Sequence, residues 1–196
     1  MVACQDSIVV EIAQALAETL EWTGQVVARV GPAQMNLRTP CPDWDLRALV
    51  SHLIGGNVMY AMGAEGEAPD LDRLRGDLTG SDPVGIYRTS AARAIAAWRT
   101  VDLGSTMSLP HGVTPASFSI RMHLMDHLLH GWDLMVALGE PREAPEHLVA
   151  LGQEIVEGLP TEIARSPRVF GRPTVAPVGA AKFDQLAALC GRTPLE

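Results

Sequence analysis

The chain has 196 residues, of which 47% are apolar; this excludes a disordered protein, and its three scattered cysteines, Cys4, Cys41 and Cys190, exclude a secreted disulfide scaffold. The formal net charge of −8 disfavours a broad grip on nucleic-acid phosphates, so no nucleic-acid partner is expected. Because the apolar stretches are too short to span a bilayer and the N-terminus lacks signal-peptide character, we expect a cytoplasmic protein with no membrane partner.

Apolar residues that recur at intervals of three and four predict four long helices. In chain order these are expected at about 7–30, 46–62, 83–100 and 114–138. Their N-terminal signals, in the same order, are Asp6, Asp43 or Asp45, Asp82-Pro83 and Thr114-Pro115. Gly139 is placed to end the fourth helix in the left-handed conformation.

The segments between and after these helices predict the rest of the architecture. Residues 64–81 are acidic and rich in glycine and proline, which is typical of a long surface connection and would suit a lid. Residues 107–109 could form a brief strand, but the alternation of β-branched residues needed for a sheet is nearly absent. We therefore predict an all-α four-helix bundle with long crossover connections at 1–140. Residues 141–196 are expected to form a C-terminal helical extension packed on the bundle, with helices near 144–158 and 179–189 and an extended run at 165–177.

The fourth predicted helix carries a polar stripe. At about 100° per residue, the stripe lies within about 60° of Asp126. Its members are Ser119, His123, Asp126, His130 and Asp133. Most of the remaining circumference is apolar, so the helix should be buried and the stripe should face the bundle interior. Buried histidines and carboxylates must be paired, hydrogen-bonded or bound to a metal.

A histidine in the second predicted helix could complete a metal site. His52 lies on an apolar face, and Gly56, one turn later, leaves a gap beside the imidazole. Asp126 and His130, at i and i+4, can reach one ion from the same helix face. His52, Asp126 and His130 are therefore predicted to bind Zn²⁺ or another divalent transition metal such as Ni²⁺ or Fe²⁺. Three protein ligands would leave a coordination position open for water or substrate.

Other interpretations of the same residues have equal weight at this level. The three candidate ligands could simply be hydrogen-bonded core residues. His123 and His127 form a rival pair at i and i+4. We expect His123 and Asp133 to support the ligands or to face the substrate, whereas His111 and His147, in or near loops, should be solvated.

Two motifs in the chain resemble a known family. The segment CPDWDLRALVSHLIGG (Cys41–Gly56) resembles a signature of the mycothiol-dependent maleylpyruvate isomerase N-terminal-domain type, with a tryptophan followed by a leucine and a histidine. The segment DHLLHGWDL (Asp126–Leu134) resembles its second signature, an acidic residue followed after three positions by His-x-Trp-Asp. The wider group is the DinB-like superfamily of metal-binding four-helix bundles. The chain's ending resembles that of an uncharacterised actinobacterial branch.

The resemblance implies roles for particular residues. It implies that His52, Asp126 and His130 are the metal ligands, and that the metal holds the sulfur of a low-molecular-weight thiol such as mycothiol. The family's isomerase has glutamate at the acidic position, so Asp126 is one methylene shorter. That isomerase also has a C-terminal domain larger than the roughly 55 residues that follow the predicted bundle here.

These observations lead to two hypotheses for function. The first is a metal-dependent enzyme in which a mycothiol-like thiol attacks a small electrophile, in transfer or isomerisation, with His123 or Asp133 moving protons or orienting ligands. The alternative is a non-catalytic metal-binding or stress-response bundle that acts through a protein partner. A homodimer would suit that alternative. Cys41 is expected to be structural.

Overall fold

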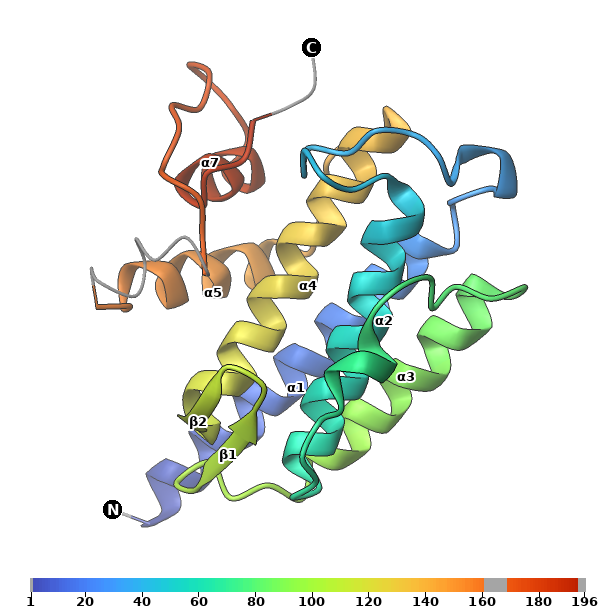
Figure 1. Cartoon of the computed structure of the whole chain (residues 1–196). Helices are drawn as coiled ribbons and strands as arrows, with labels where there is room; N and C mark the ends of the chain where they lie inside the picture. Colours follow the sequence, from blue (N-terminus) through green and yellow to red (C-terminus); the bar gives the residue numbers. More distant parts are fainter. Residues whose placement is uncertain (1, 161–168, 194–196) are drawn as a thin grey trace.

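The computed structural model describes residues 2–160 and 169–193, and its main body is a bundle of four long helices (Figure 1). These helices are α1 (Val2–Val27), α2 (Leu46–Ala64), α3 (Pro83–Trp98) and α4 (Ala116–Leu138). Helix α1 packs against α3 and α4, and α2 packs against the same two helices. Consecutive helices α1 and α2 therefore lie diagonally in the bundle, joined by a crossover that includes the short 3₁₀ helix η1 (Pro32–Gln34). The predicted all-α bundle with crossover connections is confirmed.

Local chemistry accounts for three of the helix ends. Asp45 caps α2 by accepting the backbone N–H of Ala48 at 2.9 Å. Asp82 caps α3 in the same way, with Pro83 in the first turn, and Gly139 ends α4 with φ of 68°. The predicted start of α1 is wrong, because the helix already begins at Val2, before Asp6. No proline or glycine stands between them to stop the helix from extending.

A β-hairpin precedes α4, in a place where the sequence predicted a helix start. Strand β1 (Thr106–Leu109) pairs antiparallel with β2 (Gly112–Pro115), which confirms the brief strand expected at 107–109. Thr114-Pro115 ends the second strand rather than opening the helix, and α4 begins at Ala116. The Thr114 hydroxyl lies 2.7 Å from that of Ser119, so it links the hairpin to the first turn of α4.

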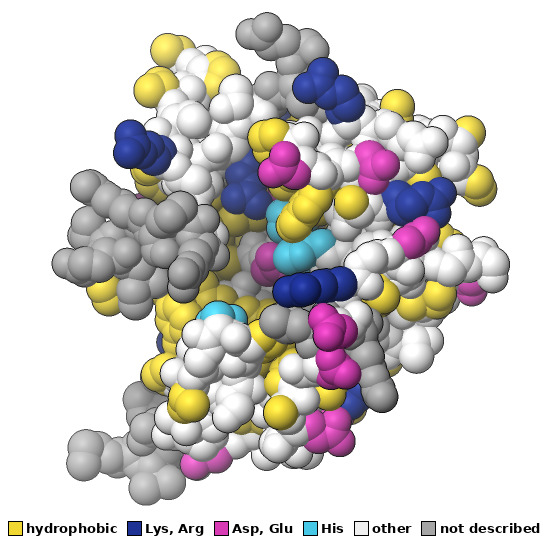
Figure 2. All heavy atoms as spheres, viewed as in Figure 1, with side chains coloured by type: hydrophobic (Ala, Val, Ile, Leu, Met, Phe, Trp, Pro, Cys, Tyr) yellow, Lys and Arg dark blue, Asp and Glu magenta, His cyan; other side chains and the backbone are white. Residues whose placement is uncertain are grey.

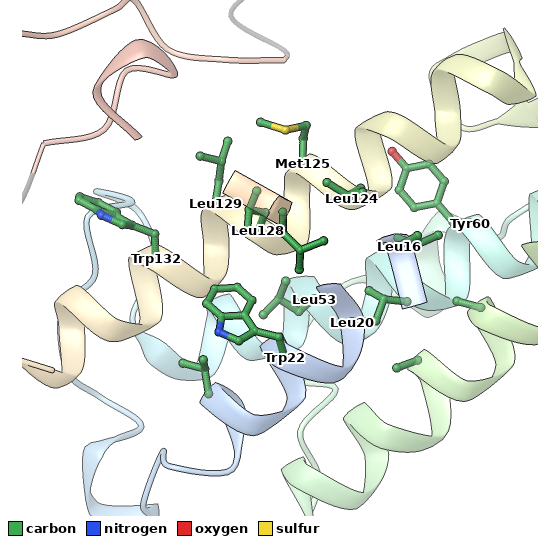
Figure 3. Close-up of a cluster of buried hydrophobic side chains, with 14 of the residues drawn as sticks. Leu16, Leu20, Trp22, Leu53, Tyr60, Leu124, Met125, Leu128, Leu129 and Trp132 are labelled. Atoms are coloured by element: carbon green, nitrogen blue, oxygen red, sulfur yellow. The ribbon is translucent and has the colours of Figure 1, made fainter. Parts of the chain in front are cut away.

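Apolar side chains from three helices form the centre of the bundle (Figure 3). Leu16 and Leu20 of α1, Leu53 of α2, and Leu124 and Leu128 of α4 are each no more than 1% exposed. This packing fixes the rotation of α4 about its axis, because its leucines must face α1 and α2. The polar stripe of α4 is thereby placed at a definite position beside α2.

Helices α5 (Glu146–Glu157) and α7 (Lys182–Leu189) follow the bundle and lie close to the ranges predicted for them. Helix α5 packs on α4, and α7 packs on α5 and α4. The indole N–H of Trp132 in α4 donates to Asp184 of α7 at 2.8 Å, which ties the two helices together. Of the predicted extended run, 169–177 forms neither helix nor strand, and 165–168 lies outside the described residues. The division of the chain at residue 140 stays a prediction.

The connection between α2 and α3 contains the 3₁₀ helix η2 (Leu71–Leu74) and is anchored to α2. Arg47 pairs with Asp77 at 3.1 Å, and the backbone N–H of Leu78 donates to the Ser51 hydroxyl at 3.0 Å. Whether this connection acts as a lid stays a prediction. No helix in the described parts of the chain combines the length and the apolar character needed to cross a bilayer.

Candidate metal centre

The side chains of His52, Asp126 and His130 meet where α2 packs against α4. His52 Nε2 lies 3.1 Å from Asp126 Oδ1, and His130 Nε2 lies 3.4 Å from the same oxygen. One donor atom from each residue falls within 4.8 Å of the other two. Two imidazole nitrogens and one carboxylate oxygen at such separations can converge on one ion after small movements, since zinc ligands lie at about 2.0–2.2 Å from the metal.

A glycine gives this cluster its space. A β-carbon added to Gly56 would lie 3.6 Å from Asp126 Oδ2 and 3.8 Å from His127 Cε1. The glycine therefore faces the carboxylate with room for a methyl group, and a side chain larger than alanine at this position would compete for the volume around it. This geometry, together with the donor set, fits a divalent transition metal.

The three side chains differ in their access to solvent. His130 is 7% exposed at its side chain, whereas Asp126 is 27% and His52 is 35% exposed. The cluster is thus enclosed on the His130 side and open on the His52 side. Trp44 covers part of the open side, with its ring centroid 4.5 Å from that of His52. Sequence reasoning missed Trp44 as a site residue, although it is the tryptophan of the first family motif.

Asp133 holds the far side of the His130 ring. His130 Nδ1 donates to Asp133 Oδ2 at 2.8 Å, which leaves Nε2 directed at Asp126. Arg192, from the C-terminal extension, donates to the same Asp133 oxygen at 3.3 Å. Sequence reasoning missed Arg192, because no periodicity or spacing connects it with α4.

Opposite charges in the cluster shift the pKa values of Asp126 and His130. Burial by itself raises the pKa of the Asp126 carboxyl, but the charges of His52 and His130 outweigh burial and hold that pKa well below its usual range. Burial lowers the pKa of His130, yet the Asp126 charge and hydrogen bonds to Asp126 and Asp133 raise it well above its usual range. The lowered pKa favours the carboxylate form of Asp126, which is the form in which an aspartate binds a metal. A metal ion would have to displace a proton from His130 on binding.

Cys41 lies beside this site rather than at a distance from it. Its sulfur is 3.5 Å from Asp133 Oδ2 and 4.0 Å from His130 Nδ1, so Cys41, His130 and Asp133 form a second group with ligand-like separations. The Arg192 guanidinium already occupies Asp133 Oδ2 and would repel a cation placed there. The group with His52 and Asp126 is therefore the better candidate for a metal.

The rival pair His123 and His127 belongs to a buried hydrogen-bond network. His123 accepts the indole N–H of Trp98 at 3.0 Å, and its other nitrogen lies 3.0 Å from the Asn57 carbonyl oxygen. Both ring nitrogens are thus used by neighbouring protein groups. His127 donates from Nδ1 to the backbone carbonyl of His123 at 3.2 Å, and its buried Nε2 has no hydrogen-bond partner.

The remaining histidines lie where solvent reaches them. His111 is exposed at the tip of the hairpin. His147 is 64% exposed at its side chain and pairs with Glu18 at 2.7 Å. This placement agrees with the solvated surroundings expected for both.

Three cavities in the described part of the chain border the cluster. One, of about 580 Å³, includes Asp126 and His130 in its lining, and one of about 440 Å³ includes His52 and Trp44. The smallest, of about 330 Å³, includes His130 and Cys41. Figure 2 shows a hollow on one face, with histidine, acidic and basic side chains gathered near its centre and hydrophobic side chains along one side. Small molecules could therefore reach the cluster from more than one direction.

Comparison with known proteins identifies the relatives of this fold. The family model described as "Mycothiol maleylpyruvate isomerase N-terminal domain" matches residues 16–135, which include all three residues of the cluster. The uncharacterised proteins MT0763 and Rv0738, from two strains of Mycobacterium tuberculosis, are each 28% identical over 173 residues, covering 86% of this chain and 90% of theirs.

The crystal structure of the mycothiol-dependent maleylpyruvate isomerase superposes on this chain with a TM-score of 0.57 at 14% identity. The match covers 76% of this chain and 69% of that chain. A histidine-to-alanine mutant of the same isomerase gives a TM-score of 0.58. At this identity the likeness concerns the fold, and it confirms the predicted DinB-like bundle.

Proposed function

Because the chain belongs to the mycothiol maleylpyruvate isomerase N-terminal domain family, we propose that it is a metal-dependent enzyme acting on a low-molecular-weight thiol of the mycothiol class. The second substrate in this proposal is a small electrophile, which the thiol attacks in transfer or isomerisation. The proposal is carried by the convergence of His52, Asp126 and His130 from two helices onto one point. Zn²⁺ suits this donor set, as do Ni²⁺ and Fe²⁺.

In this proposal, some residues of the chain would hold the metal ion and others would orient those ligands. A bound divalent cation would supply the positive charge that keeps a thiol sulfur deprotonated at neutral pH. His52, Asp126 and His130 would hold that cation. Asp133 fixes the orientation of His130 through the hydrogen bond to Nδ1, and Arg192 fixes Asp133. Trp44 packs on the half-exposed His52 ring and limits its rotation.

Metal stoichiometry of purified variants tests the ligand assignment. We expect His52→Ala and His130→Ala each to lose stoichiometric metal in elemental analysis, while the protein stays folded by circular dichroism. His147→Ala is the matched control, because the His147 side chain is 64% exposed and belongs to neither group with ligand-like separations. Normal metal content in His52→Ala would overturn the assignment.

A spectroscopic titration tests the thiol. In the Co²⁺-substituted protein, we expect mycothiol to produce a thiolate-to-metal charge-transfer band, because the three protein ligands leave room for the sulfur. A thiol-free analogue of the same sugar scaffold serves as the control. If millimolar mycothiol leaves the spectrum unchanged while metal binding is intact, the non-catalytic metal-binding alternative replaces the enzyme.

A further inference from the structure

One face of α4 lines the cavity of about 580 Å³ with apolar side chains. Phe118, Met122, Met125 and Leu129 follow one another at steps of four, three and four residues, and all four line the cavity. At about 100° per residue these positions fall within an arc of about 60°. They form a continuous apolar stripe, and this stripe runs alongside the polar stripe that carries Asp126 and His130.

Apolar residues from three further segments also line the cavity, beside the polar residues His111, Ser119 and Arg192. Leu109 comes from the hairpin, Tyr60 comes from α2, and Val169 and Phe170 come from the C-terminal extension. Leu109, Tyr60 and Phe170 are each 7% exposed, so they are held in place by packing. Helix α4 and these three segments therefore contribute apolar side chains to one cavity, the apolar chamber, which borders the candidate metal centre at Asp126 and His130.

Arg192 and Asp126 in the cavity lining are already paired with other protein groups, and His111 lines the cavity from the exposed tip of the hairpin. Arg192 is the only lining residue of the described chain with a permanent positive charge, and its guanidinium donates to Asp133 Oδ2 at 3.3 Å and to the Cys190 carbonyl at 3.4 Å. Asp126 lies against His52 and His130. A ligand with two carboxylates would have to enter without a free arginine or lysine, which is costly in an apolar site.

We propose that this cavity binds an uncharged, largely apolar ligand with a body of one or two aromatic rings, and that it discriminates against small dicarboxylates. In taking this ligand to be the electrophile, with its reactive end at Asp126 and His130, the inference rests on the proposed function. The binding of the apolar body itself depends only on the chamber. Met122 and Met125 are flexible, so the walls can adapt to ligands of different shapes.

Equilibrium binding to the metal-free protein tests the inference. The probes are 2-acetylnaphthalene, which is uncharged and apolar, and maleate, a small dicarboxylate. We expect the metal-free protein to bind 2-acetylnaphthalene at least about tenfold more tightly than maleate, as apolar walls require. Equal or tighter binding of maleate to the metal-free protein would overturn the proposal.

Variants locate the bound probe. Met122 is half-buried on the cavity wall, and Met122→Glu should weaken 2-acetylnaphthalene binding by about tenfold or more because it introduces a charge into an apolar wall. Val178→Glu is the matched control at a fully exposed apolar side chain, and it should bind the probe normally. Unaltered binding in Met122→Glu would place the probe elsewhere and refute the proposal.

A measurement on the unmutated protein covers the case in which Met122→Glu does not fold. With ¹³C-labelled methionine methyl groups, 2-acetylnaphthalene should shift the signals of Met122 and Met125 and leave that of Met35 unchanged, since Met35 does not line the cavity. Absence of these shifts at saturating probe would contradict the proposal. The binding and methyl-shift measurements need neither metal nor thiol. A chain that fails to bind metal would therefore refute the proposed function, while the preference of the chamber for apolar ligands would still be tested by these measurements.

Discussion

Gly131 lies where α4 packs closely against Trp22 of α1. It directly follows the candidate ligand His130 in the sequence. A β-carbon added at Gly131 would overlap Cζ3 and Cη2 of the Trp22 ring. Trp22 is 9% exposed and packs edge-on against Phe183, with ring centroids 5.9 Å apart. The ring therefore cannot swing away without disturbing α7, which Phe183 anchors.

The magnitude for Gly131→Ala follows from two opposing terms. Alanine is favoured over glycine inside a helix by about 1 kcal/mol. Overpacking of a close-packed interior costs about 1–3 kcal/mol, and the rigid indole puts this substitution near the upper value. We therefore expect the free energy of unfolding to fall by about 2 kcal/mol.

Urea denaturation followed by far-ultraviolet circular dichroism measures this change. Gly56→Ala is the matched control, since its added β-carbon would make only ordinary contacts at 3.6 and 3.8 Å, and it should leave the fold as stable or up to about 1 kcal/mol more stable. Combining Gly131→Ala with Trp22→Leu should cost less than the sum of the two single losses, because the leucine removes the overlapping ring atoms. If Gly131→Ala is at least as stable as the unmodified chain, the close approach of α1 and α4 is not real.

Three further outcomes are expected. Burial lowers the pKa of His127 from 6.5 to about 4, so between these pH values the unfolded chain binds more protons than the folded chain. The free energy of unfolding should therefore rise with pH across this window by up to about 3 kcal/mol. Denaturation curves of His127→Gln should show a smaller dependence of this free energy on pH. Asp133→Asn should weaken metal affinity by about 10–100-fold in competition with a chromophoric chelator, whereas Asp72→Asn, at a side chain 91% exposed, should not. Burial raises the pKa of Cys190 to about 12, so at about pH 8 iodoacetamide should modify Cys190 only after unfolding, as peptide mass spectrometry would show.

The hairpin and the first helix show where prediction from sequence failed. Thr114-Pro115 has the composition of a helix start, yet pairing with Met107 and Thr106 places these two residues in a strand. The strand that pairs with these residues, Thr106–Leu109, lies several positions earlier in the chain. The residue types within 114–118 therefore could not reveal the pairing. Asp6 likewise has a capping side chain, but a cap residue does not end a helix when the preceding residues can also be helical.

The candidate site likewise contains residues that the sequence predicted and residues that only the folded chain reveals. The sequence alone was sufficient to single out His52, Asp126 and His130, because helical periodicity placed two of them on one face and a motif marked the third. The contribution of Trp44, Cys41 and Arg192 could be recognised only in the folded chain.

The amino-acid sequence by itself determined the four long helices, the ends at Asp45, Asp82 and Gly139, and the polar stripe of α4, since these depend on neighbours within about one turn. Tertiary packing alone decided which side chains support the stripe and how the apolar chamber closes around it. Those contacts join the hairpin, α2 and the C-terminal extension across long separations in sequence. Their energies come from shape and burial in three dimensions, which no periodicity within a single segment records.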